Sequence, residues 1–446
     1  MTDNDPFEQA RRAFEEGLAA LQGGQPSRAE SALRQSLQWL PGRPSTLNAL
    51  GVAVLRQGRA AEALPLFDQA LAADSGLAQA YGHRAETLSA LGRFDDALLA
   101  LDRAPAADPA TLWHRAAALN ALGRHPQALA ALNTLRAHQP GHAAPWLELG
   151  KTHQSLGQTA QAINAYRQAL TLAPTLAQAW SLLGQLFNDT GDKAQAEHCL
   201  EQAMAHGADP ELHGWMLAAL RGGPAPAHPP AAYVKALFDG YAHGFEQHLS
   251  QTLKYDAPKR LAQMVAGTGV GLPVQALDLG CGSGLCALAL REQGIGVAAT
   301  DGVDLSPTML GHARSTGLYR HLHATDVAQH MAACDDRYDL LLAADVFIYV
   351  GALGPVFSGA RRVLNVGGRF ALCVEAASPA EALGPGFALR SSLRYSHSTA
   401  YVLGLATQHG FTVLAQEDAP LRQDQGRAVQ GHYFVLAANS GAQRVV

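Results

Sequence analysis

The chain has 446 residues, about three times a typical domain of roughly 150 residues, so the length excludes one small domain and predicts two or more. Apolar residues make up 48% and charged residues 16%, which provides enough apolar side chains for buried cores and excludes global disorder. The net charge is -5 and there is no basic run. Nucleic acid is therefore disfavoured as a main partner.

The cysteines and the N-terminal segment bear on the cellular compartment. The five cysteines form no Cys-x-x-Cys pair, so we expect neither a disulfide framework nor a zinc cluster, and no metal. Residues 1–12 carry acidic side chains where a signal peptide would carry positive charge followed by an apolar stretch. The apolar run 340–350 is interrupted by Asp345 and is too short to span a bilayer. We therefore expect a cytoplasmic protein with reduced thiols and no membrane insertion.

The first half of the chain is an internal repeat. Glycine recurs at intervals of 34, 34, 31, 34 and 34 residues, and an alanine stands five residues after each of these glycines, from Ala29 to Ala196. Two residue types that keep one register predict a helical repeat array. The glycines are Gly24, Gly58, Gly92, Gly123, Gly157 and Gly191.

Each unit is predicted to consist of two antiparallel helices, such as 144–156 and 160–172. The glycine between them ends the first helix because it tolerates left-handed dihedral angles, and small residues such as Gly150 let the two helices approach closely. A proline such as Pro174 ends the second helix. With bulky aromatic residues at fixed positions, the pattern resembles the tetratricopeptide repeat (TPR) over about residues 10–210.

The resemblance implies a binding role for the repeats. A stacked TPR superhelix presents a concave groove that usually binds an extended peptide or a partner protein, so we expect a protein or peptide partner. The alternative is that the array only packs on its neighbour domain or dimerises, because the sequence names no groove residues. The third unit is three residues shorter than the others, and we place this loss at the join between the third and fourth repeats.

Composition marks the end of the array. Residues 210–221 are predicted to form a capping helix, so six repeats and this helix occupy residues 10–221. Residues 222–232 are rich in Pro, Gly and Ala and are predicted to form a semi-rigid linker. The rest of the chain, 233–446, is predicted to be a separate domain that binds its cofactor without the repeats.

From Val274 the sequence changes to short apolar runs that alternate with helical stretches, which predicts a doubly wound parallel sheet. The first strand ends in Gly280-Cys281-Gly282-Ser283-Gly284, and Asp278 stands two residues before the first glycine. Glycines let the backbone pass close to a ligand at the carboxyl end of a strand. This segment resembles motif I of class I S-adenosylmethionine (SAM)-dependent methyltransferases, which implies a seven-stranded, mostly parallel Rossmann-like sheet and SAM as the cofactor.

The second strand carries two acids. Asp304 lies 20 residues beyond Gly284, about where an acid accepts hydrogen bonds from ribose hydroxyls in dinucleotide-type folds. Asp301 is the rival acid. We prefer Asp304 because the family pattern Gly-Val-Asp-Leu-Ser-Pro surrounds it, although a single Asp at a strand end is also a common helix N-cap.

Later strands supply further candidate residues. Asp326 ends the third strand and, by resemblance, meets the adenine amino group; Asp345 ends the fourth and faces the cofactor cleft. Two further strands, 411–416 and 433–437, complete the sheet, the last of them antiparallel. The resemblance assigns these residues to the cofactor: Asp278, Gly280, Cys281, Gly282, Gly284, Asp304, Leu305, Met309, Asp326, Val327 and Asp345.

Segments that flank motif I narrow the resemblance. Residues 237–249 and 394–401 are similar to those of predicted bacterial methyltransferases with N-terminal TPRs, so the resemblance covers nearly the whole chain. The resemblance to that family does not indicate which substrate is methylated. It implies a helical lid over residues 233–266, whose Tyr241 and Phe245 cover the cofactor; plain core aromatic residues are the alternative.

Methyl transfer is an in-line displacement for which the protein supplies position, a dry site and, for some acceptors, a general base. The Asn-Pro-Pro-Tyr motif and the Pro-Cys pair are both absent, which disfavours nucleobases as acceptors. For a hydroxyl or a protonated amine a base is needed, and among the residues near strand ends we select Tyr349 and His397 as catalytic candidates.

We expect an enzyme that methylates an O or N acceptor on a protein or carrier-bound substrate recruited by the repeats. Two alternatives stay open. One is a small-molecule methyltransferase whose repeats serve assembly only, and the other is a TPR scaffold whose SAM-binding domain is not catalytic.

Overall fold

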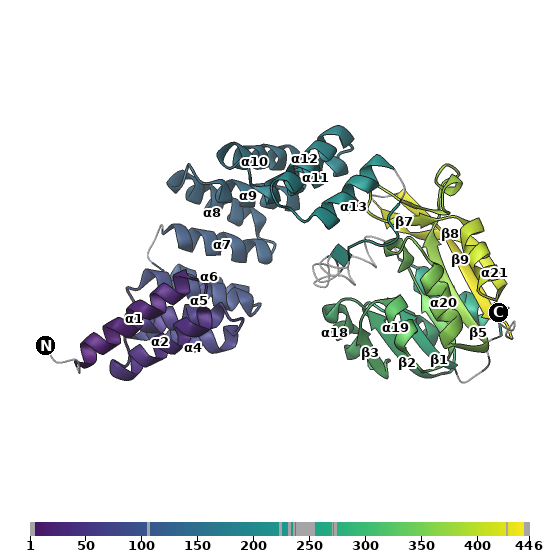
Figure 1. Ribbon diagram of the computed structural model, residues 1–446, viewed down its shortest axis with the longest axis horizontal. Helices are drawn as coiled ribbons and strands as arrows, with labels where there is room; N and C mark the ends of the chain where they lie inside the picture. Colours follow the sequence, from purple (N-terminus) through teal and green to yellow (C-terminus); the bar gives the residue numbers. More distant parts are fainter. Residues whose placement is uncertain are drawn as a thin grey trace. The chain divides into compact units, whose positions relative to one another are not determined.

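The computed structural model describes residues 5–104, 108–222, 225–230, 233–234, 237, 255–269, 271, 274–424 and 427–440 (Figure 1). The chain divides by its internal contacts into two compact units, and the second unit begins at Phe187. Most of the predicted lid, including Tyr241 and Phe245, lies outside the described residues.

Thirteen helices lie between residues 6 and 221 in the part of the chain that the structure describes, as six successive pairs and one further helix, α13. The all-α array predicted from the repeats is confirmed. The helices are α1 (Pro6–Gln22), α2 (Pro26–Trp39), α3 (Pro44–Leu55), α4 (Ala60–Ala73), α5 (Ala78–Ala90), α6 (Phe94–Asp102), α7 (Pro109–Ala121), α8 (His125–His138), α9 (Ala143–Ser155), α10 (Thr159–Leu172), α11 (Ala177–Asp189), α12 (Lys193–Ala205) and α13 (Pro210–Arg221).

Small residues build these pairs as the sequence predicts. All six turn glycines, from Gly24 to Gly191, have a positive φ between 66° and 82°, a conformation that a side chain rarely adopts. A Cβ atom added to Gly150 would lie only 2.3 Å from the ring of Tyr166 on the partner helix. Close approach of the two helices therefore requires glycine at this position.

Helix α6 differs from the second helices of the neighbouring repeats. It has 9 residues, whereas α4 and α8 have 14 each. This is the shortened third unit, and the short helix agrees with our placing of the loss before the fourth repeat. A pocket of about 650 Å³ lies among α6, α7 and α8, and Leu99, which is 62% exposed, lines it.

The second unit contains a seven-stranded sheet with the order β3-β2-β1-β4-β5-β9-β8. The first five strands run parallel, and β9 is antiparallel to both of its neighbours. The predicted methyltransferase-type sheet is confirmed. Its strands are β1 (Val274–Leu279), β2 (Val297–Asp304), β3 (His321–Ala324), β4 (Tyr338–Ala343), β5 (Leu364–Glu375), β8 (Phe411–Asp424) and β9 (Arg427–Ala438).

Helices cover both faces of this sheet, and Figure 1 shows α19, α20 and α21 on one of them. Alternate residues of β1 point to opposite faces: Leu277 packs with Phe357 and Phe370 on the α20 side, while Ala276 packs with Leu261 on the α16 side. The helices are α16 (Ala257–Ala266), α17 (Leu285–Glu292), α18 (Pro307–Ser315), α19 (Val327–Ala333), α20 (Gly354–Val363) and α21 (Thr399–Gln408), with 3-10 turns η2 (Phe347–Tyr349) and η3 (Glu381–Leu383).

A second, two-stranded sheet was not predicted from the sequence. It pairs β6 (Phe387–Leu389) with β7 (Tyr395–His397) in antiparallel fashion and is inserted between β5 and α21. No helix among the described residues is long and apolar enough to cross a membrane.

Candidate functional site

The glycine-rich turn lies at the carboxyl end of β1, between β1 and α17. The chain continues from β1 to β2 on one side of the sheet and returns to β4 on the other, so this is the topological switch point where such sheets bind ligands. Gly280, Gly282 and Gly284 have φ values of 64°, 51° and 100°. A Cβ on Gly280 would lie 2.5 Å from a methyl group of Val346. The turn therefore requires glycine for two reasons: its φ angles are positive, and no space is left for a Cβ beside Val346.

Asp304, at the end of β2, connects its strand to this turn. Its carboxylate accepts hydrogen bonds from the backbone N–H of Gly282 and of Ser306, each at 2.9 Å. The Ser306 side chain in turn accepts from the N–H of Met309 and caps α18. Met309 is fully buried and Leu305 is half-buried.

Asp278 is a fully buried carboxylate beneath the turn. Its Oδ2 accepts a hydrogen bond from the Tyr319 hydroxyl at 2.6 Å, and no N–H or O–H group among the described residues donates to Oδ1. Burial raises the pKa of Asp278 to about 7; hydrogen bonds from the Tyr319 hydroxyl and the Cys286 thiol oppose this effect, and the nearby charge of Asp304 reinforces it. Tyr319 escaped the sequence analysis, because no motif links it to Asp278, 41 residues earlier.

Asp301, the rival acid, is occupied elsewhere. Arg320 donates to both of its oxygens, at 3.0 and 2.5 Å, and the Tyr338 hydroxyl donates at 3.0 Å. Burial alone would raise the pKa of Asp301, but these hydrogen bonds and the charge of Arg320 outweigh it and lower the pKa. This carboxylate ties β2 to β3 and β4.

Asp326 and Val327 stand where the third strand gives way to α19. The Asp326 carboxylate accepts from the N–H groups of Ala328 and Gln329, both at 2.9 Å, and caps α19, while Val327 packs in the core. No observation tests the contact of Asp326 with adenine, and it stays a prediction.

Asp345 follows β4 with a φ of 57°, one of two positive values among the described non-glycine residues. Both of its oxygens accept from Arg422 Nη1, at 2.6 and 2.8 Å, and Arg422 Nη2 donates to Glu375 at 2.6 Å. Burial raises the pKa of Asp345, and Arg422 partly opposes this. No sequence motif marks Arg422, which reaches Asp345 from β8, 77 residues later.

The two predicted catalytic bases differ in their surroundings. Tyr349 is half-buried in η2, and burial raises its pKa to about 12. His397 is fully buried, its Nε2 lies 3.0 Å from the Gly351 carbonyl oxygen, and burial lowers its pKa to about 4. A base must reach the acceptor, and a fully buried ring bonded to the backbone is poorly placed to do so. Both roles stay predictions.

Four family models match this chain. One, described as a methyltransferase domain, matches residues 276–368, which run from β1 to the start of β5 and include the glycine turn and Asp304. The C-terminal half carries a methyltransferase domain. Two tetratricopeptide repeat models match residues 14–78 and 54–119, and a TPR repeat model matches 150–191.

Curated proteins are similar to this chain over part of their length. The chain is 26% identical over 220 residues to the biotin biosynthesis bifunctional protein BioCD of Bordetella avium, covering 48% of this chain and 44% of that protein. It is 30% identical over 138 residues to a malonyl-[acyl-carrier protein] O-methyltransferase of Pseudescherichia vulneris, covering 31% and 51%. This chain thus spans about half the length of these relatives.

One solved structure has low sequence identity and a low TM-score to this chain. It is the Burkholderia thailandensis 1,6-didemethyltoxoflavin-N1-methyltransferase with bound 1,6-didemethyltoxoflavin and S-adenosylhomocysteine, at 20% identity and a TM-score of 0.37, covering 49% of this chain and 94% of that one.

Proposed function

We propose that this protein is a SAM-dependent methyltransferase. The observation that carries the proposal is the glycine turn at the switch point of the sheet, held by Asp304 through the N–H of Gly282. The site suits the cofactor in two respects. A Cβ on Gly282 would meet only Met309, at 3.5 Å, so the backbone there can pass close to a ligand. The buried Oδ1 of Asp278, which no described N–H or O–H group reaches, offers an acceptor for an ammonium group.

The predicted cofactor residues take defined roles in this proposal. Asp278 pairs with the amino group of the methionine part, Asp304 accepts from the ribose hydroxyls, and Asp326 with Val327 borders the adenine. Gly280, Cys281, Gly282 and Gly284 form the backbone cradle, with Leu305, Met309 and Asp345 around it. Bound SAM supplies a methyl group that its sulfonium already activates.

The residues of the chain itself position the methyl donor and the acceptor and exclude water from the site. Asp345 and Tyr349 lie in the segment that packs on the glycine turn through Val346, so they border the place where the acceptor approaches. If the acceptor must lose a proton, Tyr349 or His397 takes it. Of the two, Tyr349 is the more accessible.

We further propose that the acceptor is an oxygen or nitrogen on a protein or a carrier-bound substrate that the repeats recruit. A relative is named as a methyltransferase of a malonyl group on acyl-carrier protein. The first unit offers a pocket of about 650 Å³ with the exposed Leu99 in its wall. The free state of all five cysteines supports a cytoplasmic location.

The test uses the full-length chain and SAM with a radioactive methyl group. A cell extract is separated into macromolecules and small molecules, and each fraction is incubated with the enzyme. We expect label in the macromolecular fraction, and none with Asp278→Asn as the matched control. Calorimetry with S-adenosylhomocysteine (SAH) checks that the wild-type chain binds the cofactor product.

Each alternative has its own outcome. Label confined to the small-molecule fraction supports repeats that serve assembly only, whereas SAH binding with no transfer to either fraction supports the non-catalytic scaffold. No SAH binding would refute the proposed cofactor. For recruitment, a chain that begins at Phe187 should bind SAH with the wild-type affinity but lose kcat/KM for the labelled macromolecule; unchanged kcat/KM would refute it.

A further inference from the structure

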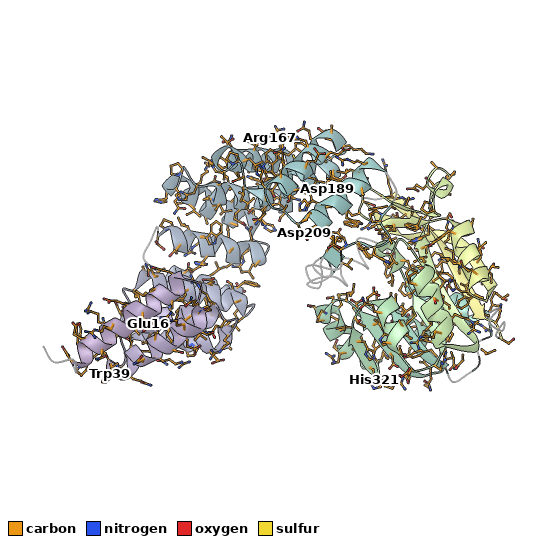
Figure 2. The ribbon with its side chains drawn as sticks, in the orientation of Figure 1. Glu16, Trp39, Arg167, Asp189, Asp209 and His321 are labelled. Atoms are coloured by element: carbon orange, nitrogen blue, oxygen red, sulfur yellow. The ribbon has the colours of Figure 1, made fainter. Side chains whose placement is uncertain are left out.

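The small sheet of β6 and β7 is bonded to helices of the repeat array. Trp215 in α13 donates its indole N–H to the Tyr395 hydroxyl at 3.0 Å, and both side chains are buried. At the tip of the same hairpin, the side-chain amide of Asn188, in α11, donates to the Ser391 carbonyl at 2.8 Å. All four residues belong to the second unit. Figure 2 labels Asp209, which caps α13.

The segment 345–353, which we call the β4 loop, packs against this sheet. A Cβ on Gly351 would lie 2.6 Å from the ring of Tyr395, so ring and loop backbone are in direct contact. The Gly351 carbonyl lies 3.0 Å from His397 Nε2, and the Leu353 N–H donates to the Tyr401 hydroxyl at 2.9 Å. The β4 loop is therefore held in place by the small sheet and, through Tyr401, by α21.

The chain between α13 and the lid region holds the other side of the same loop. The carbonyl oxygen of Ala227 accepts from the backbone N–H groups of both Gly351 and Ala352, each at 3.0 Å. At its beginning, the β4 loop reaches the glycine turn, because Val346 fills the space beside Gly280. One continuous series of contacts thus runs from α13 to the turn.

We propose that Trp215 is a positioning residue for methyl transfer: through Tyr395, and together with Ala227, it fixes the β4 loop against the glycine turn. The inference rests on the proposed function, since it assigns the loop to the cofactor and acceptor. Asp345 opens the loop in a left-handed conformation, which costs energy and persists only where the surroundings hold it.

The proposal changes the expected extent of the catalytic unit. Residues 233–446 lack both Trp215 and Ala227, so on this proposal that fragment should bind the cofactor more weakly than the full chain does. The end of the repeat array is then part of the machinery that shapes the site.

The test compares three single variants in the full-length chain. Trp215→Phe keeps an aromatic ring but removes the N–H, and Tyr395→Phe removes only the hydroxyl. Trp180→Phe is the matched control, because Trp180 donates its indole N–H to the Pro174 carbonyl within the repeats. The readouts are hydrogen exchange at the Gly351 and Ala352 amides and the SAH dissociation constant, measured well below the melting temperature.

We expect Trp215→Phe and Tyr395→Phe each to speed exchange at the two amides and to raise the SAH dissociation constant by about five- to tenfold. The double variant should be no worse than the more severe single one. If Trp215 had a purely structural role, Trp215→Phe would lower Tm, but its SAH dissociation constant and its exchange rates at these amides would equal those of Trp180→Phe. That result would overturn the proposal. If the wild-type chain fails to bind SAH, the proposed function fails, and the exchange rates still decide whether Trp215 fixes the loop.

Discussion

Replacing Asp304 by alanine should weaken SAH binding by about 10- to 100-fold. The carboxylate already accepts two backbone N–H bonds, and in the proposed complex it also accepts from the ribose. Hydrogen bonds to a charged group contribute roughly 1.5–3 kcal/mol each, and about 1.4 kcal/mol corresponds to tenfold in affinity. Loss of one such bond, with a loosened Gly282 turn, gives this range.

Calorimetry with two ligands separates the ribose contact from the turn. SAH and its 2′-deoxyribose analogue should bind the wild-type chain with different affinities. They should bind Asp304→Ala with similar affinities, because the acceptor of the hydroxyl is gone. If the variant still discriminates as the wild type does, Asp304 acts only on the turn.

Asp301→Ala is the matched control. It should change SAH affinity by less than about threefold, because the carboxylate of Asp301 is bonded to Arg320 and Tyr338. It should lower Tm, since it leaves those donors without their acceptor. The assignment of the ribose acid is wrong if Asp301→Ala loses affinity with an unchanged Tm while Asp304→Ala binds normally.

Three further results are expected. Because burial raises the pKa of Asp278 to about 7, SAH affinity should fall by up to about tenfold per pH unit below that value as its carboxylate protonates; a flat calorimetric profile between pH 8 and pH 6 contradicts this. Gly150→Ala, whose Cβ would meet Tyr166 at 2.3 Å, should cost about 1–3 kcal/mol of unfolding free energy in urea, against almost none for Gly141→Ala, which has open space. Arg422→Met leaves the buried carboxylate of Asp345 unpaired, whereas Glu375 keeps Arg390, and should cost about 3–5 kcal/mol of unfolding free energy. Because burial raises the pKa of Asp345, the loss should shrink as pH falls and Asp345 protonates, and a loss independent of pH would show that Asp345 is not charged.

The sequence by itself determined the features that depend on short stretches of chain. A helical pair with its glycine turn is complete within one repeat, so the recurrence from Gly24 to Gly191 was enough to predict the array. The strand and glycine turn from Asp278 to Gly284 are likewise contiguous in sequence. The dihedral angles of this tight turn and the lack of space for a Cβ at Gly280 both demand glycine. The sequence pattern around Asp304 favours it as the ribose acid, and the hydrogen bond between Asp304 and Gly282 is consistent with that assignment.

The tertiary structure alone decided which side chains meet across the fold. Asp278 and Tyr319 are 41 residues apart, Asp345 and Arg422 are 77 apart, and Trp215 lies 180 residues from Tyr395. No local preference encodes such pairs, because each exists only once strands and helices have packed and a buried polar group needs a partner. For the same reason His397, which looked like a base beside a strand end, proved to be bonded to the backbone of the β4 loop. Propensity and periodicity act along the chain, whereas hydrogen-bond partners and burial are properties of the packed fold.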